Sequence, residues 1–312
     1  MAAATQVPNA RKVLVLAAGG TISMKGELES GHEGVLPALD GEGLVEAVEG
    51  LSAFPGVEGR TVVNKPSAHL TLDDQLDVCR QARDAARRGT GVVVTHGTDS
   101  LEETAMLCDL LHDAEAPIIF TGAIRPASAP GADGPANLLD AVVTARDAHA
   151  RGVLVVVAGR VWAGAELRKV HSYRIDAFGA GDAGALALIE EGALRWLREV
   201  PLGDVLGPAR VARDAAQWPR VEIVTSHAGA GGGLVEALVA QGVDGIVAAG
   251  TGNGTLHRDL EAALLRAQSA GTRVLRCTRC AAGPVLGQTP LRSAGSLSAP
   301  QARVELLLQL LA

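Results

Sequence analysis

Short, unbroken runs of aliphatic residues recur along this chain and constrain its fold more than any other feature. Such runs lie within residues 12–18, 91–95, 117–121 and 153–158, and each of these segments is about as long as one strand. Strands with apolar side chains on both faces are typical of parallel sheets covered by helices. Aromatic residues make up only 2% of the chain, so the core must be built from Val, Leu, Ile and Ala.

Helical patterns alternate with these runs. The sequence from Thr71 to Asp74 fits a capping box that opens a helix, and Gly89 stands where that helix should stop. A second helix is expected from Ser100, and a third from residue 133 to 152. A strand is expected over residues 60–64. The rhythm of strand, loop and helix predicts right-handed crossovers and a largely parallel sheet.

The rhythm lapses once, which predicts two domains. Proline and glycine interrupt a polar stretch around residues 195–220, and strand and helix patterns then resume. The chain has 312 residues, enough for two cores. We therefore predict an α/β protein with a larger, mostly parallel N-terminal domain over residues 1–195. A linker over 196–219 would lead to a smaller parallel α/β domain over 220–312.

Composition and charge exclude several classes of protein. The net charge of −7 disfavours a nucleic-acid binder. No segment approaches the ~20 apolar residues of a membrane span. The first apolar run, residues 13–18, is too short for a signal peptide, so a cytoplasmic location is expected. The four cysteines are expected to be reduced, and the lone C-x-x-C at 277–280 does not predict a metal site.

Small and polar residues follow three strands, over 18–21, 95–99 and 249–253. Ligands of open α/β sheets bind outside the carboxyl ends of the strands. Thr21 follows two glycines and is a candidate nucleophile, although it could equally be a turn hydroxyl. Asp99 could cap a helix or bind a substrate ammonium, beside a second hydroxyl on Thr98. Lys169 could be a surface lysine or the partner of a threonine hydroxyl.

Taken together, these motifs resemble the bacterial-type L-asparaginases, which are threonine amidohydrolases. The similarity runs through nearly the whole chain, and its most specific stretch is Thr95-His-Gly-Thr-Asp-Ser-Leu-Glu-Glu-Thr104. The other matching motifs are Gly19-Gly-Thr-Ile22, Gly122-Ala-Ile-Arg-Pro126, Ala132-Asp-Gly-Pro135, Gly252-Asn-Gly254 and Gly295-Ser-Leu with the residues up to Arg303.

The resemblance implies hydrolysis of L-asparagine to L-aspartate and ammonia, without a cofactor or metal. Thr21 would form an acyl-threonine intermediate, and Thr98, Lys169 and Asp99 match the family's second threonine, lysine and aspartate. The resemblance also implies that Ser67 would bind the substrate α-carboxylate and that Asn253 would come from a neighbouring subunit of a homodimer or homotetramer. The scissile amide also needs oxyanion donors, for which the Thr98 and Ala123 backbones are candidates. Glutamine or another small amide as substrate, and a weakly active amino-acid sensor, are the alternatives.

The sequence departs from the family pattern near the nucleophile. The family commonly places a tyrosine in the loop after the first threonine, whereas the single tyrosine here is Tyr173. The glutamine that often follows the binding serine is Ala68, and residues 281–289 offer no obvious match to an acidic residue of many relatives. Residues 24–37 are expected to form a mobile loop. The pair of Thr98 and Lys169 is therefore the predicted proton relay.

Overall fold

The computed structural model describes residues 11–23, 39–201, 203–211 and 215–311. The predicted loop over residues 24–37 lies outside them. The N-terminal domain holds an eight-stranded sheet in the order β10-β9-β6-β5-β4-β3-β1-β2. Its strands are β1 (Val13–Ala18), β2 (Val57–Thr61), β3 (Gly91–His96), β4 (Ile118–Thr121), β5 (Val153–Val157), β6 (Arg160–Ala163), β9 (Ala187–Glu190) and β10 (Ala193–Trp196).

The predicted parallel sheet forms one half of this domain. Strands β2, β1, β3, β4 and β5 pair in parallel, whereas β5, β6, β9 and β10 pair antiparallel. The antiparallel half was not predicted. Its two tight turns, Ala158-Gly159 and Glu191-Gly192, have positive φ at both residues, as type I′ hairpins require. Neither turn carries the Asn-Gly or Asp-Gly pair that would have marked a hairpin in the sequence.

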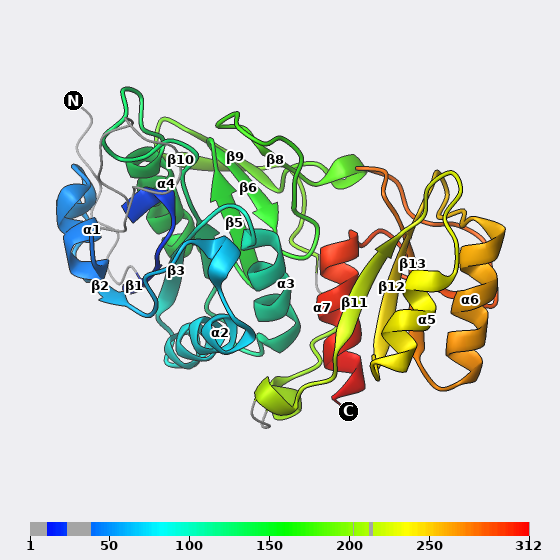
Figure 1. Cartoon of the computed structure of the whole chain (residues 1–312). Helices are drawn as coiled ribbons and strands as arrows, with labels where there is room; N and C mark the ends of the chain where they lie inside the picture. The colour runs from blue at the N-terminus through cyan, green and yellow to red at the C-terminus, as the bar shows by residue number, and fades with distance from the viewer. Residues whose placement is uncertain (1–10, 24–38, 202, 212–214, 312) are drawn as a thin grey trace.

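Helices cover both faces of the parallel half (Figure 1). Alternate residues of a strand point to opposite faces. In β1, Leu14 and Leu16 pack with α2 (Leu72–Arg87) and α3 (Leu101–Leu111), whereas Val13 and Val15 pack with α4 (Gly134–Arg146). Helix α1 (Gly41–Ala47) packs against β2 at the sheet edge. The unbroken aliphatic runs are therefore explained by burial on two faces.

Two predicted boundaries were wrong. The strand expected at 60–64 is β2, which pairs with β1 from Val57 to Thr61, and α1 packs on it at Gly59. A Cβ at Gly59 would lie 2.0 Å from the Gly41 carbonyl oxygen. The helix expected to reach residue 152 ends at Arg146. Asp147 accepts a hydrogen bond from the His149 N–H at 2.8 Å, a local turn that competes with the helix.

The C-terminal domain is a smaller sheet whose strands are all parallel, as predicted. Its strands are β11 (Val221–Thr225), β12 (Gly245–Gly250), β13 (Arg273–Thr278) and β14 (Arg292–Ser293), and its helices are α5 (Gly233–Ala240), α6 (Arg258–Ser269) and α7 (Ala299–Leu310). Figure 1 shows α5 and α6 on one face and α7 on the other, between the two sheets. Helix α7 also packs against α3, so it joins the two domains. Ser298 and Gln301 cap it reciprocally.

Within the described residues, no helix is long and apolar enough to cross a membrane.

Candidate active site

Two glycines bring the turns after β1 and β3 into direct contact. Gly20 has a φ of +85°, and a Cβ on it would lie 2.5 Å from the Gly97 Cα. Parallel pairing of β1 with β3 already places Ala18 beside His96. The close approach therefore sets the turn that carries Thr21 against the turn that carries Thr98. Thr21 is half-buried and begins a short 3-10 helix, Thr21–Ser23, whereas Thr98 is buried.

Ser67 joins this edge from the loop before α2. A Cβ on Gly97 would lie 2.6 Å from the Ser67 Oγ, so glycine is what allows the hydroxyl to approach. The Asp99 N–H donates to the Ser67 Oγ at 3.2 Å, and the Ser100 hydroxyl donates to the Ser67 carbonyl at 2.7 Å. Ser100 thus occupies the N-cap position before α3, but its side chain holds the Ser67 loop and makes no cap hydrogen bond.

Lys169 reaches the same edge from a short hairpin of β7 (Arg168–Lys169) and β8 (Phe178–Gly179). Its Nζ donates to the Thr98 Oγ1 at 3.0 Å and to the Asp99 Oδ1 at 2.7 Å. The Lys169 side chain is 18% exposed and the Asp99 side chain 67% exposed. Lys169 is therefore not a solvated surface lysine, and Asp99 keeps an open face toward solvent.

The turn after β4 completes the edge. A Cβ on Gly122 would lie 2.5 Å from the His96 carbonyl oxygen, so Ala123 follows directly beside the β3 turn. The Asn137 side chain donates to the Gly122 carbonyl at 2.9 Å and accepts from the Ala158 N–H at 2.9 Å. Sequence reasoning did not single out Asn137. Its sequence position, three residues into a helix that begins Gly134-Pro135, gave no sign of this role.

Burial shifts the pKa of two groups next to the site. It lowers the pKa of His96 to about 4, so this imidazole is neutral at pH 7. The His96 Nδ1 lies 2.8 Å from the Gly97 carbonyl, and because a carbonyl oxygen can only accept, the proton is on Nδ1. Burial also raises the pKa of the Glu102 carboxyl, which accepts a hydrogen bond from the Lys169 N–H at 2.8 Å.

Asn253 is the one predicted site residue that the chain does not bring to this edge. It lies in the turn after β12, where its side chain donates to the Leu286 carbonyl at 3.0 Å and accepts from the Leu286 N–H at 2.7 Å. Among the described residues, no recorded contact joins it to Thr98, Asp99 or Lys169. Within one chain, Asn253 ties two loops of the C-terminal domain together.

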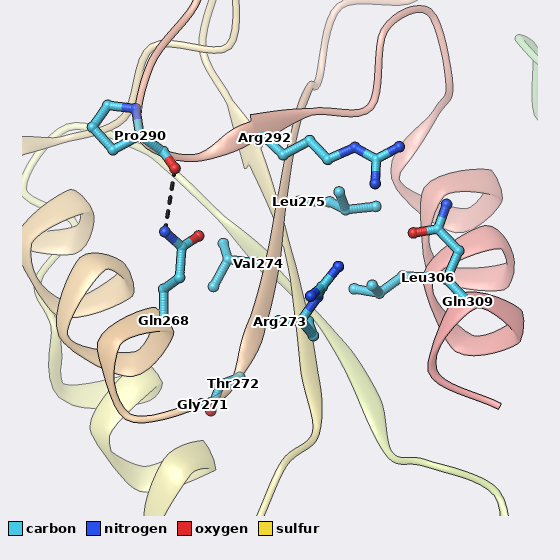
Figure 2. A pocket seen from close by; sticks show the side chains of 10 residues that line it. All are labelled: Gln268, Gly271, Thr272, Arg273, Val274, Leu275, Pro290, Arg292, Leu306 and Gln309. Carbon is cyan, nitrogen blue, oxygen red and sulfur yellow. Dashed lines mark hydrogen bonds between the residues drawn. The ribbon is translucent and has the colours of Figure 1, made fainter. Parts of the chain in front are cut away.

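Of two cavities in the described part of the chain, one adjoins the candidate site and the other lies in the C-terminal domain. One of about 280 Å³ is lined by Ser67, Asp99 and Ser100, and extends toward Gln75 and Arg303. The other, of about 380 Å³, lies in the C-terminal domain over the start of β13 (Figure 2). The 10 residues that line it include neither a carboxylate nor a lysine, so it offers no partner for a substrate ammonium. The first cavity is the one that adjoins the candidate site.

The part of the chain that the structure describes holds no group of three His, Cys, Asp or Glu side chains placed to bind a metal ion. Its four cysteines are free thiols, and those of Cys79, Cys108 and Cys277 are buried.

Comparison with known proteins agrees with this arrangement. Residues 12–202 match the family model "Asparaginase, N-terminal", and residues 220–312 match "Glutaminase/Asparaginase C-terminal domain". The "L-asparaginase 2" of Escherichia coli K12 is 33% identical over an alignment of 317 positions, which covers 99% of this chain and 90% of that protein. The "Glutaminase-asparaginase" of Pseudomonas fluorescens biotype A is 32% identical, over 87% of this chain and 76% of that protein.

A solved structure confirms the likeness of the fold. The probable cytoplasmic L-asparaginase from Campylobacter jejuni superposes with a TM-score of 0.86 at 29% identity, covering 96% of this chain and 95% of that one. The two family models together span both sheets, in the order that the sequence motifs predicted. The chain belongs to the bacterial-type L-asparaginase family, whose members hydrolyse amide bonds.

Proposed function

We propose that this chain hydrolyses L-asparagine to L-aspartate and ammonia through an acyl-enzyme intermediate on Thr21. The observation that carries the proposal is the contact of the Lys169 Nζ with both the Thr98 Oγ1 and the Asp99 Oδ1, at the sheet edge where the Thr21 turn packs. This edge unites a candidate nucleophile, a proton relay and a carboxylate, as hydrolysis of an amino-acid amide requires.

Asp99 and Ser67 have the chemistry to bind the two charged α groups of the substrate. The exposed face of the Asp99 carboxylate can accept hydrogen bonds from the ammonium. The Ser67 Oγ already accepts from the Asp99 N–H, so its own O–H is free to donate to the α-carboxylate. Both residues line the same cavity of about 280 Å³. Binding the α groups there would leave the side-chain amide to face the Thr21 and Thr98 turns.

The proposed reaction then follows in two balanced steps. The Thr21 Oγ attacks the amide carbon and its proton passes through Thr98 to the leaving nitrogen, which departs as ammonia. Water next adds to the acyl-threonine, the ester bond breaks, and a proton returns to the Thr21 Oγ. Lys169 donates to the Thr98 Oγ1 and so stabilises negative charge on that oxygen during both transfers.

Two backbone amides are suited to stabilise the oxyanion. The N–H groups of Thr98 and Ala123 donate to no other described residue, although both residues are buried. Their turns lie side by side because Gly122 approaches the His96 carbonyl. Donors placed in this way favour the negative oxygen of a tetrahedral intermediate over the neutral carbonyl of the substrate.

Ammonia release by Thr21→Ala, compared with wild type, tests the nucleophile. We expect turnover to be abolished while the fold persists, because a turn hydroxyl contributes little stability. Thr90→Ala is the matched control. Thr90 immediately precedes β3, so it lies at the end of that strand opposite to the end where the Thr21 and Thr98 turns meet. Ammonia release near the wild-type rate by Thr21→Ala would refute the assignment.

Glutamine is the second candidate substrate, and the name of the C-terminal family model gives it specific support. The ratio of kcat/KM for asparagine and glutamine decides between them. A sensor that binds without turnover is the third alternative. It would show an asparagine-dependent rise in Tm with no ammonia release.

A homodimer or homotetramer and a cytoplasmic location also belong to this proposal. Within the described part of the chain, no hydrogen bond joins Asn253 to another predicted site residue, which is consistent with its donation to a neighbouring subunit. Mixing inactive Asn253→Ala with inactive Thr21→Ala should then restore part of the activity, because mixed assemblies contain some intact sites. The similar protein from Campylobacter jejuni is called cytoplasmic, and cell fractionation tests that location for this chain.

A further inference from the structure

Lys169 lies on a support that is separate from the main sheet. Its hairpin pairs Arg168 with Gly179 and Lys169 with Phe178, and these two pairs are the whole ladder of that small sheet. An isolated two-stranded ribbon of this length is not stable by itself. The position of the Lys169 Nζ must therefore depend on contacts that hold the hairpin from outside.

Arg168 provides the largest set of such contacts, and all of them reach the C-terminal domain. Its Nη1 donates to the Cys280 carbonyl at 3.2 Å and to the Ala281 carbonyl at 2.9 Å, and its Nη2 donates to the Ser296 carbonyl. The planar guanidinium suits this task because its donors form a fixed fork. One side chain thus joins the hairpin to two separate loops of the other domain.

Gln301 strengthens the same junction from α7. Its buried amide donates to the Ala165 carbonyl at 3.0 Å and to the Leu167 carbonyl at 2.9 Å. The Gln301 Oε1 also accepts from the Ser298 N–H at 3.0 Å, in the capping box that begins α7. The segment that leads into β7 is therefore bound to the first turn of a helix in the C-terminal domain.

The alternation of side chains along a strand explains how the contacts of Arg168 fix the position of Lys169. Adjacent residues of a strand point to opposite sides. Arg168 points to the C-terminal loops, and Lys169 consequently points to Thr98 and Asp99. Glu102 fixes the backbone between the two side chains by accepting from the Lys169 N–H.

We propose that Arg168 is a positioning residue for Lys169, through which the C-terminal domain aligns the proton relay of its own chain. This inference rests on the proposed function, in which Lys169 supports proton transfer through Thr98. It gives the C-terminal domain a role in its own chain's chemistry, in addition to any residue that it donates to a neighbour.

A double-mutant cycle on the full chain tests the proposal. Arg168→Met should lower kcat about 10- to 100-fold, as a displacement of about 1 Å can do, with a much smaller change in KM. Arg168→Lys should recover part of the lost kcat, because its ammonium keeps the positive charge and can still donate hydrogen bonds. It lacks the planar arrangement of donors that the guanidinium has. Arg174→Met is the matched control. Arg174 lies on the same hairpin, but its recorded ion pair is with Asp176 at the surface.

The decisive comparison is made in the Lys169→Met background. If Arg168 acts through Lys169, adding Arg168→Met there should leave kcat unchanged, while its loss of Tm should persist. An equal fall in kcat in both backgrounds would show a general structural role and would overturn the proposal. An unchanged kcat for Arg168→Met in the wild-type background would also overturn it.

A chemical readout separates this proposal from the proposed function. The rate of Lys169 acetylation by acetic anhydride, followed by peptide mass spectrometry, reports its accessibility whether or not it takes part in catalysis. Acetylation should be faster in Arg168→Met than in wild type, and unchanged in Arg174→Met. If Lys169→Met kept full activity, the relay would be wrong, yet faster acetylation would still support the anchor. Unchanged acetylation would refute the anchor independently of activity.

Discussion

Replacing Lys169 by methionine isolates the proton relay from the stability of the fold. Methionine keeps most of the aliphatic stem and removes the ammonium that donates to Thr98 and Asp99. The Asp99 side chain is 67% exposed, so the lost ion pair should change the free energy of unfolding by no more than ~1 kcal/mol. Groups that support general acid–base catalysis contribute ~10²–10⁴-fold. We therefore expect kcat to fall by two to four orders of magnitude (about 10²–10⁴) in a protein that remains folded.

The assay is ammonia release under saturating asparagine, with Tm measured on the same samples. The comparison variants are Glu27→Gln, Glu29→Gln and His32→Gln, which change three of the titratable side chains of the loop after Thr21. These three residues lie outside the described part of the chain, and the predicted relay does not involve them. Each replacement should cost far less than Lys169→Met. A loop replacement that lowered kcat as strongly would place the missing base in that loop and refute the relay.

Three further predictions each concern a single residue. Asp99→Ala should raise KM for asparagine at least about tenfold, because the substrate ammonium would no longer have a carboxylate to pair with. An unchanged KM would show that Asp99 does not bind the substrate and only precedes the helix. Gly20→Ala should lower both Tm and kcat, since its Cβ would meet the Gly97 backbone at 2.5 Å. Gly152→Ala, with φ +68° and no atom within 4 Å, should lower Tm alone. Burial raises the pKa of Asp109 to about 6. As the pH rises from 4 to 7, the free energy of unfolding of wild type should therefore fall by up to ~3 kcal/mol relative to that of Asp109→Asn. Urea unfolding at several pH values measures this difference.

The sign of the Asp109 effect follows from proton uptake. Between the ordinary carboxyl pKa of 3.8 and the folded value of about 6, the folded state keeps a proton that the unfolded state has lost. Stability therefore falls as the pH rises through this window. Asparagine does not titrate, so the variant lacks this dependence. Unfolding curves whose difference stayed constant with pH would contradict the argument.

The sequence predicted those parts of the site that follow strands of the parallel sheet. A buried aliphatic run followed by glycine and threonine marks the end of such a strand, and parallel pairing places all such ends at one edge. Thr21 and Thr98 could be placed together for this reason, whereas Ala123 was named as an oxyanion donor only after the family resemblance. The close approach of Gly20 to Gly97 is also the kind of contact that only glycine permits.

The position of Lys169 could not be derived in the same way. It lies on a two-residue strand, too short for any periodic pattern, and its supports are Glu102 and Arg168. Local sequence gives no sign that a glutamate in the first turn of α3 will hold a backbone 67 residues away. The lysine was assigned from the resemblance to the family, and its geometry became evident only in the folded chain.

The two halves of the candidate site therefore differ in how their geometry is maintained. The threonine turns are held by the sheet itself, where hydrogen-bonded strands and glycine contacts leave little freedom. The lysine is held by side chains that cross from one domain to the other. A small shift of the C-terminal domain would move the lysine while leaving Thr21 and Thr98 in place. Proton transfer should consequently be more sensitive than substrate binding to changes at the domain junction, and kcat should respond before KM does.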